Sequence, residues 1–146
     1  MSYDLDAAID IAASPARVWA VLADFSRYPD WNPFIRSITG VQRVDEHLRV
    51  HIVPPGGKGM VFKPRVLAVE PERELRWKGR LLFPGLFDGE HRFRITPNNG
   101  GVRFRQSETF TGLFVALMPI SVWTQTKAGF EAMNEALKQR AEDHPP

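Results

Sequence analysis

Residues 74–111 read ELRWKGRLLFPGLFDGEHRFRITPNNGGVRFRQSETFT, and this stretch decides the fold. Polar and apolar residues alternate through most of it, which is the period of half-buried β-strands. Turn residues at 83–85 and 97–101 divide it into strands over 74–82, 87–96 and 102–111. Consecutive strands joined by short turns predict an antiparallel sheet with one face toward the core.

The same alternation predicts which side chains point inward. Charged residues occupy one face of each strand, so the opposite face must be the buried one. The residues expected on that face are mostly apolar: Leu75, Trp77, Gly79, Leu81, Phe87, Gly89, Phe93, Ile95, Val102, Phe104 and Phe110. His91, Gln106 and Glu108 share this face, and burying them without partners is costly. A ligand, one another, a backbone group or a trapped water must satisfy them.

Four more segments have strand character and precede this stretch. They are Tyr3–Ala12, which alternates loosely, and residues 35–44, 47–53 and 60–69, which are separated by turn residues. Together with the three strands above, they predict seven strands.

Three helical segments complete the chain. Ser14 and Pro15 mark a helix start, because serine caps free amides and proline at the first position loses no hydrogen bond. The proline-rich segment 28–34 predicts a second short helical turn. From 119 to 142, Phe130 and Met133 belong to an apolar stripe at helical spacing, which predicts one long helix.

This order of elements predicts an α+β fold in which the long C-terminal helix covers one face of the sheet. A flat sheet of seven strands is too wide for a single helix to cover its whole face. Twist and curvature of the sheet are therefore expected to leave a cavity between the sheet and the helix.

Several stretches resemble the START-like or SRPBCC superfamily: residues 14–25, 28–34, 75–79 and 106–112. Within it, the chain is most similar to the polyketide cyclase/dehydrase and lipid transport group. The resemblance implies a single helix-grip (Bet v 1-like) domain over residues 1–146. It implies no single activity, because the superfamily contains binding proteins, transfer proteins, cyclases and co-chaperones.

Composition narrows the functional classes. The chain has 146 residues, 43% hydrophobic and 25% charged, which is ordinary globular usage, and no cysteine. Its net charge of +2 is too small to predict a nucleic-acid partner. The N-terminus does not resemble a secretory signal and no apolar run is long enough to span a membrane, so we expect a cytoplasmic protein. We expect it to be a monomer or a homodimer.

We expect the cavity to bind a small hydrophobic molecule such as a lipid, a polyketide or an aromatic metabolite. The expected apolar walls are Trp31, Phe34, Trp77, Phe87, Phe93, Phe110, Phe130 and Met133. His91, Gln106 and Glu108 are expected to orient a polar end of the ligand. No cofactor is expected. His47 and His51 share a face, but nothing nearby completes a ligand set, so no metal site is predicted.

The sequence also allows two other functions. In the first, His91 and Glu108 form the acid–base pair of a cyclase or dehydratase. In the second, outward rows of basic residues on strands 74–82, 87–96 and 102–111 bind a protein partner. The apolar segments 81–87 and 112–119 are expected either to form a mobile cavity mouth or to pack against each other.

Overall fold

The structure is a computed structural model that describes residues 2–80 and 85–143. Its strands are β1 (Ser2–Ile11), β2 (Ile35–Thr39), β3 (Arg49–Ile52), β4 (Met60–Phe62), β5 (Arg65–Glu70), β6 (Glu74–Arg80), β7 (Asp88–Asn98) and β8 (Gly101–Thr111). Its helices are α1 (Pro15–Ala23), α2 (Tyr28–Trp31) and α3 (Ile120–Asp143), with short 3-10 turns η1 (Phe25–Arg27) and η2 (Leu113–Leu117).

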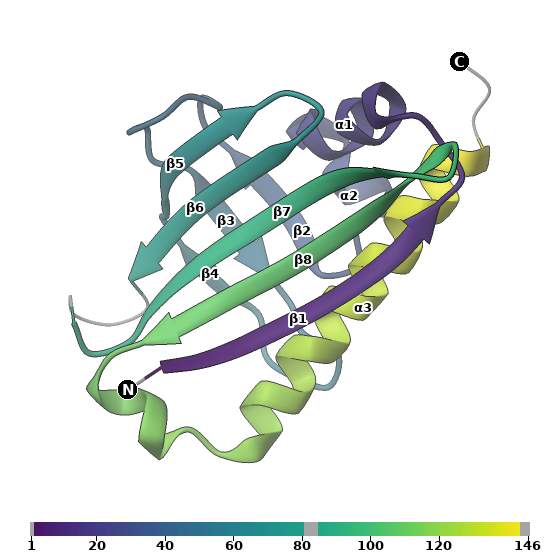
Figure 1. The fold of residues 1–146 in the computed structure, drawn as a ribbon. Helices are drawn as coiled ribbons and strands as arrows, with labels where there is room; N and C mark the ends of the chain where they lie inside the picture. Colours follow the sequence, from purple (N-terminus) through teal and green to yellow (C-terminus); the bar gives the residue numbers. More distant parts are fainter. Residues whose placement is uncertain (1, 81–84, 144–146) are drawn as a thin grey trace.

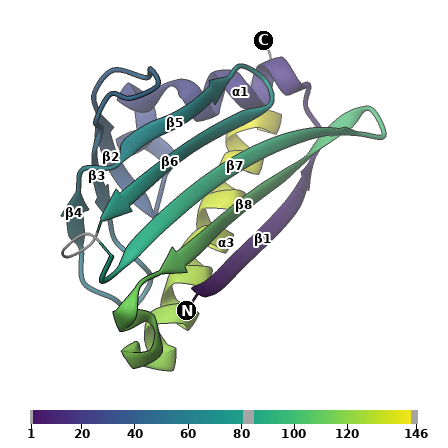
Figure 2. The same cartoon turned by 60° about the vertical axis from the view of Figure 1, so that its left-hand side comes forward.

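The strands form two antiparallel sheets. The larger has the order β1-β8-β7-β6-β5, and the smaller has the order β2-β3-β4. The larger sheet curves around α3, and the smaller sheet lies behind it in Figure 1 and to its left in Figure 2. An isolated bridge between His47 and Arg65 joins the two, and Leu48 N donates to Pro64 O at 2.9 Å. The α+β helix-grip architecture is thus confirmed.

The predicted count of seven strands is wrong, because the segment 60–69 forms two strands. Pro64 lies between β4 and β5, and proline has no N–H with which to continue a ladder. The segment predicted over 35–44 also ends early, at Thr39. Gly40 follows with φ of +125°, a conformation that takes the chain out of the strand.

The N-terminal helices form where the sequence predicts them. Ser14 Oγ accepts a hydrogen bond from Arg17 N at 3.1 Å, and Pro15 occupies the first helical position. Tyr28 of α2 is completely buried, and its hydroxyl donates to the carbonyl of Leu22. Burial raises the pKa of Tyr28 well above its ordinary value. These contacts attach the short helices to the core.

Helix α3 packs along the inner face of the larger sheet. Phe130, Met133 and Leu137 are fully buried, as their spacing predicts. At Gly129 the ring of Phe34 lies against the helix backbone so closely that any Cβ would overlap it. The absence of a side chain at position 129 therefore allows the segment before β2 to contact the helix directly.

Among residues 2–80 and 85–143, no helix combines the length and the apolar character needed to cross a bilayer. The predicted apolar hairpin over 81–87 lies partly outside the described residues. In the other predicted apolar segment, Leu113 and Leu117 are largely exposed, whereas Val115 is buried.

Candidate ligand cavity

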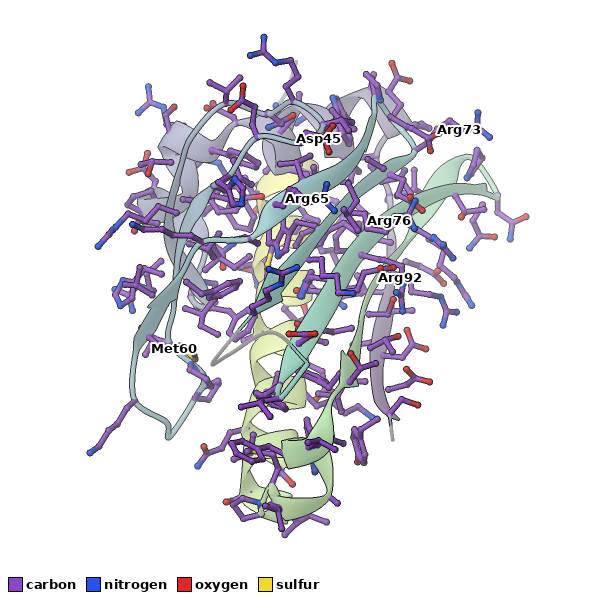
Figure 3. The ribbon with its side chains drawn as sticks, turned by 90° about the vertical axis from the view of Figure 1, so that its left-hand side faces the viewer. Asp45, Met60, Arg65, Arg73, Arg76 and Arg92 are labelled. Carbon is purple, nitrogen blue, oxygen red and sulfur yellow. The ribbon has the colours of Figure 1, made fainter. Side chains whose placement is uncertain are left out.

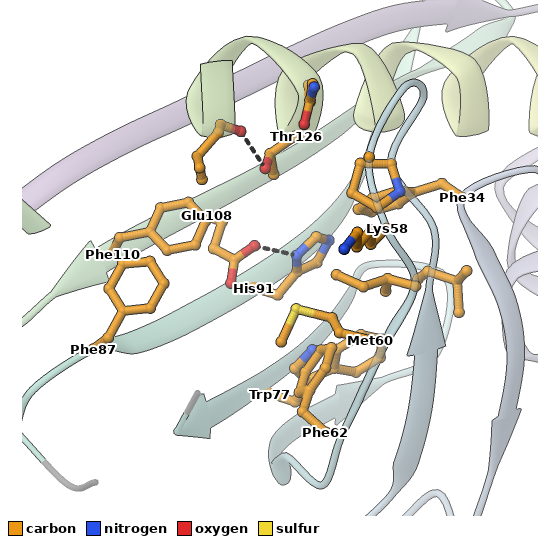
Figure 4. Close-up of a pocket in the computed structure, with 16 residues that line it drawn as sticks. Phe34, Lys58, Met60, Phe62, Trp77, Phe87, His91, Glu108, Phe110 and Thr126 are labelled. Carbon is orange, nitrogen blue, oxygen red and sulfur yellow. Dashed lines mark hydrogen bonds and ion pairs between the residues drawn. The ribbon is translucent and has the colours of Figure 1, made fainter. Parts of the chain in front are cut away.

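A cavity of about 220 Å³ lies between the larger sheet, the smaller sheet and the first half of α3 (Figure 4). The larger sheet and its edge supply one wall, which is mainly aromatic. Trp77 stacks on the His91 ring at 5.5 Å between centroids, and Phe87 stacks on Phe110 at 5.6 Å. These stacked pairs hold the wall in a defined shape.

The other walls come from segments far away in the sequence. Helix α3 contributes Val122, Gln125 and Thr126, and the loop between β3 and β4 contributes Pro54, Gly57 and Lys58. The smaller sheet and the residue before it contribute the apolar side chains Phe34, Ile35, Ile52, Met60 and Phe62. The loop is held to the helix by a hydrogen bond from Gln125 Nε2 to the carbonyl of Gly56, at 3.4 Å.

A polar cluster lies on the otherwise apolar wall of the larger sheet, and strand register assembles it. His91 of β7 is the direct cross-strand partner of Glu108 on β8 and of Trp77 on β6. His91 Nδ1 lies 3.0 Å from Glu108 Oε1, and His91 Nε2 lies 2.9 Å from Gln106 Oε1. Both ring nitrogens are therefore occupied by side chains of one neighbouring strand.

Beyond Gln106, the cluster continues away from the cavity. Gln106 Nε2 donates to Asn134 Oδ1 at 3.0 Å and to the carbonyl of Phe130 at 3.4 Å. Asn134 Nδ2 then donates to the carbonyl of Ala7 at 3.2 Å. Backbone carbonyls can only accept, so they fix the orientation of both amides, and Gln106 Oε1 must face His91.

Six of the eleven predicted ligand residues line the cavity: Phe34, Trp77, Phe87, His91, Glu108 and Phe110. Four others, Phe93, Gln106, Phe130 and Met133, are completely buried and are not among the residues lining it. Gln106 reaches the cavity only through His91. The inward positions predicted from alternation are confirmed for Trp77, His91, Phe93, Gln106 and Phe110.

The prediction that Trp31 belongs to the cavity wall is not supported by its position. Trp31 lines a separate surface cleft together with Arg17, Arg27 and Arg140. Its ring packs edge-on against Tyr28, at 5.1 Å between centroids. The end of α2 turns the chain between Trp31 and Phe34, so the two aromatic residues face different parts of the protein.

Sequence reasoning missed the walls contributed by the β3–β4 loop and by the first half of α3. Val122 is part of the helical apolar pattern, but nothing in that pattern shows that the space opens beside Val122 rather than beside Phe130. The glycine-rich run from Gly56 to Gly59 indicates a turn and carries no signal of a neighbouring cavity.

The basic rows on the outer face of the larger sheet are largely paired with acidic residues. Arg94 contacts Glu74 at 2.7 Å, and Arg92 contacts Glu90 at 3.0 Å. Arg103 donates to Asp10 at 3.0 Å, and this hydrogen bond holds the pKa of Asp10 below its ordinary value. Arg76 and Arg92 lie on the sheet face turned away from α3 (Figure 3).

Solved structures with the same fold share little sequence with this chain. An aromatase/cyclase from Streptomyces sp. R1128 superposes with a TM-score of 0.78 at 16% identity, covering 97% of this chain and 94% of that one. The structure of Ara h 8.0201 gives a TM-score of 0.75 at 17% identity, covering 99% of this chain and 100% of that one. A START superfamily protein from Mycobacterium smegmatis gives 0.73 at 21% identity, covering 96% and 97%. No curated protein is significantly similar in sequence.

These structures and the two-sheet grip around α3 define the helix-grip fold class. The family model described as polyketide cyclase / dehydrase and lipid transport matches residues 3–142. The chain belongs to that family.

Proposed function

We propose that this protein binds a small, mainly apolar molecule in the cavity beneath Trp77 and His91. The observation that carries the proposal is the mainly apolar lining, with the His91–Glu108 pair on the sheet wall and a few polar side chains, Lys58, Gln125 and Thr126, on the others. A cavity of about 150 Å³ holds benzene, so the volume of about 220 Å³ suits a molecule of one or two rings. Membership of the family and its aromatase/cyclase structural relatives support a role with hydrophobic ligands.

Native mass spectrometry of the purified protein tests the proposal. We expect a bound species of low mass to accompany the protein, or naphthalene-sized compounds to bind when added. A protein that co-purifies with nothing and binds none of a panel of one- and two-ring compounds would contradict it.

The contact between His91 and Glu108 favours a second function, acid–base catalysis on the bound molecule. A carboxylate beside an imidazole can remove a proton from a carbon next to a carbonyl, and that carbon then bonds to a second carbonyl carbon of the molecule. The π bond of the second carbonyl breaks toward its oxygen, which takes the proton back from the pair and becomes an alcohol. Such proton transfers would support an aldol-type ring closure, and loss of water would complete a dehydration. The aromatase/cyclase structures are consistent with this chemistry.

Turnover separates the two functions. A polyketide-like substrate is incubated with the wild type and with a double variant carrying His91→Phe and Glu108→Gln, and the products are followed by chromatography. If the protein is an enzyme, product should form only when the protein is present, and the rate of product formation should fall at least 100-fold in the double variant. Unchanged turnover in the double variant would exclude catalysis by this pair, and binding without conversion leaves the first function as the account of the cavity.

A further inference from the structure

We propose that the cavity selects ligands that carry a hydrogen-bond donor, such as a hydroxyl on an aromatic ring, and that Glu108 Oε2 accepts this hydrogen. The inference rests on the proposed binding function and names the chemical class of ligand. It follows from the direction in which hydrogen bonds run through the polar cluster.

The direction is set at the buried end of the cluster. The carbonyls of Ala7 and Phe130 only accept, so Asn134 and Gln106 must turn their amide nitrogens toward them. Gln106 Oε1 then faces His91 Nε2 across 2.9 Å, and this oxygen can only accept. His91 Nε2 therefore carries a hydrogen.

The other ring nitrogen shares one proton with Glu108. His91 Nδ1 and Glu108 Oε1 lie 3.0 Å apart, and two lone pairs do not face each other at this distance. The proton lies either on the ring, giving an imidazolium beside a carboxylate, or on Oε1, giving a neutral pair. A second proton on the pair would leave an uncompensated buried positive charge, which is unfavourable.

Glu108 Oε2 is an acceptor in both forms. Within residues 2–80 and 85–143 it takes part in no hydrogen bond, and Glu108 lines the cavity. Gly89 makes this placement possible, because a Cβ at position 89 would overlap Oε2. A ligand N–H or O–H would satisfy this oxygen, whereas an ether or carbonyl oxygen in the same place would face its lone pairs.

Thr126 on the opposite wall adds a second acceptor. Its Oγ1 donates to the carbonyl of Val122 at 2.7 Å, so its remaining hydrogen-bonding capacity is for accepting. The indole of Trp77 and the ammonium of Lys58 also line the cavity and are donors, so a ligand oxygen can still be accommodated. The selection therefore concerns the hydrogen of a ligand hydroxyl rather than its oxygen.

The experiment compares 2-naphthol, 2-methoxynaphthalene and naphthalene by isothermal titration calorimetry on the full chain. The methyl ether keeps the ring and the oxygen and lacks the donor hydrogen. We expect the wild type to bind 2-naphthol about tenfold more tightly than the ether. Glu108→Met is expected to bring this ratio close to one while naphthalene still binds. Glu108→Gln is expected to preserve the preference, because its amide nitrogen can donate to His91 Nδ1 and leave its oxygen in the cavity.

Equal wild-type affinities for the naphthol and its ether, or a ratio unchanged in Glu108→Met, would overturn the inference and leave the binding function standing. Failure of all three compounds to bind the wild type would instead contradict the binding function itself.

A measurement on the wild type tests the proton direction without relying on a variant that folds. Long-range ¹⁵N–¹H NMR of the free protein at neutral pH is expected to show His91 Nε2 protonated. A hydrogen only on Nδ1, with Nε2 bare, would overturn the argument.

Discussion

Gly89 and Glu108 show how a single missing side chain positions a functional group. The carboxyl of Glu108 lies over the β7 backbone, in the space that a Cβ at Gly89 would occupy. Gly89 has no positive φ, so its role is steric rather than conformational. Alanine at this position therefore has an acceptable backbone, but its Cβ requires the end of the Glu108 side chain to move.

We predict that Gly89→Ala lowers the free energy of unfolding by about 1–3 kcal/mol, because it forces the Glu108 carboxyl away from His91. In a Glu108→Ala background the same change should cost nothing or stabilise slightly, since alanine restricts the unfolded chain more than glycine does. Urea denaturation of the four proteins in this double-mutant cycle measures the coupling. Equal costs in both backgrounds would show that Glu108 does not occupy this space.

The His91–Glu108 contact could have been found from the sequence. Asn99 and Gly100 both have positive φ, at 49° and 84°, as the two central residues of a tight hairpin turn require. Asn98 pairs with Gly101, and His91 and Glu108 lie equally far from this turn, so they must pair across it. Alternation predicted the face of each residue, and the position of the Asn-Gly turn determines which residues of the two strands pair.

At the scale of elements, periodicity predicted the strands and the helix better than their ends. The alternation over 74–111 fixes faces because the buried face of a strand tolerates no slip. The break at Pro64 depends on one residue within an otherwise apolar run, and the run alone resembled one strand. The position of the cavity along α3 depends on how two sheets diverge, which no local pattern encodes.

The last turn of α3 is attached to α1 and to the segment between β1 and α1. The Arg17 guanidinium donates to the carbonyls of Arg140 and Ala141 at 3.1 and 3.3 Å. Glu142 Oε2 accepts from Ala12 N at 2.8 Å and from Lys138 Nζ at 2.7 Å. These contacts satisfy backbone groups at a helix C-terminus and hold the helix against the edge strand.

We predict that Glu142 contributes stability at neutral pH that is lost in acid. Its hydrogen bonds with Lys138 and then with the Ala12 amide lower the pKa of Glu142 in the folded protein. A lowered folded-state pKa means that the contribution is present above the ordinary carboxyl range and disappears as the pH falls through the lowered pKa. The effect should be below about 1 kcal/mol, because the pair is partly exposed.

Thermal unfolding of wild type and Glu142→Gln between pH 7 and pH 2 measures this contribution. The two curves should differ at neutral pH and converge in acid. Glu131→Gln, at an exposed position of the same helix, serves as the matched control and should track the wild type throughout. A constant gap between wild type and Glu142→Gln at all pH values would contradict the prediction.

At the scale of the whole molecule, the two halves of α3 have different surroundings: the second half packs into the core and the first half borders the cavity. Met133 and Leu137 in the second half of α3 are fully buried, whereas Val122 and Thr126 in the first half border the cavity. On the outer face, Arg103 and Arg105 are paired with Asp10 and Asp6. This pairing weakens the alternative of a basic docking face and leaves the cavity as the distinctive feature.

This division predicts opposite effects of the same substitution at two valines. The phenylalanine of Val122→Phe should extend into the cavity and weaken the affinity for 2-naphthol at least tenfold. The free energy of unfolding should stay unchanged or rise by about 0.5–2 kcal/mol. Val50→Phe, at a completely buried position of β3, should destabilise the fold by about 1–3 kcal/mol through overpacking. Urea denaturation and calorimetric titration measure both variants. If Val122→Phe costs as much stability as Val50→Phe, the space beside Val122 is already filled by packed side chains, and a cavity open to a ligand is not a property of this fold.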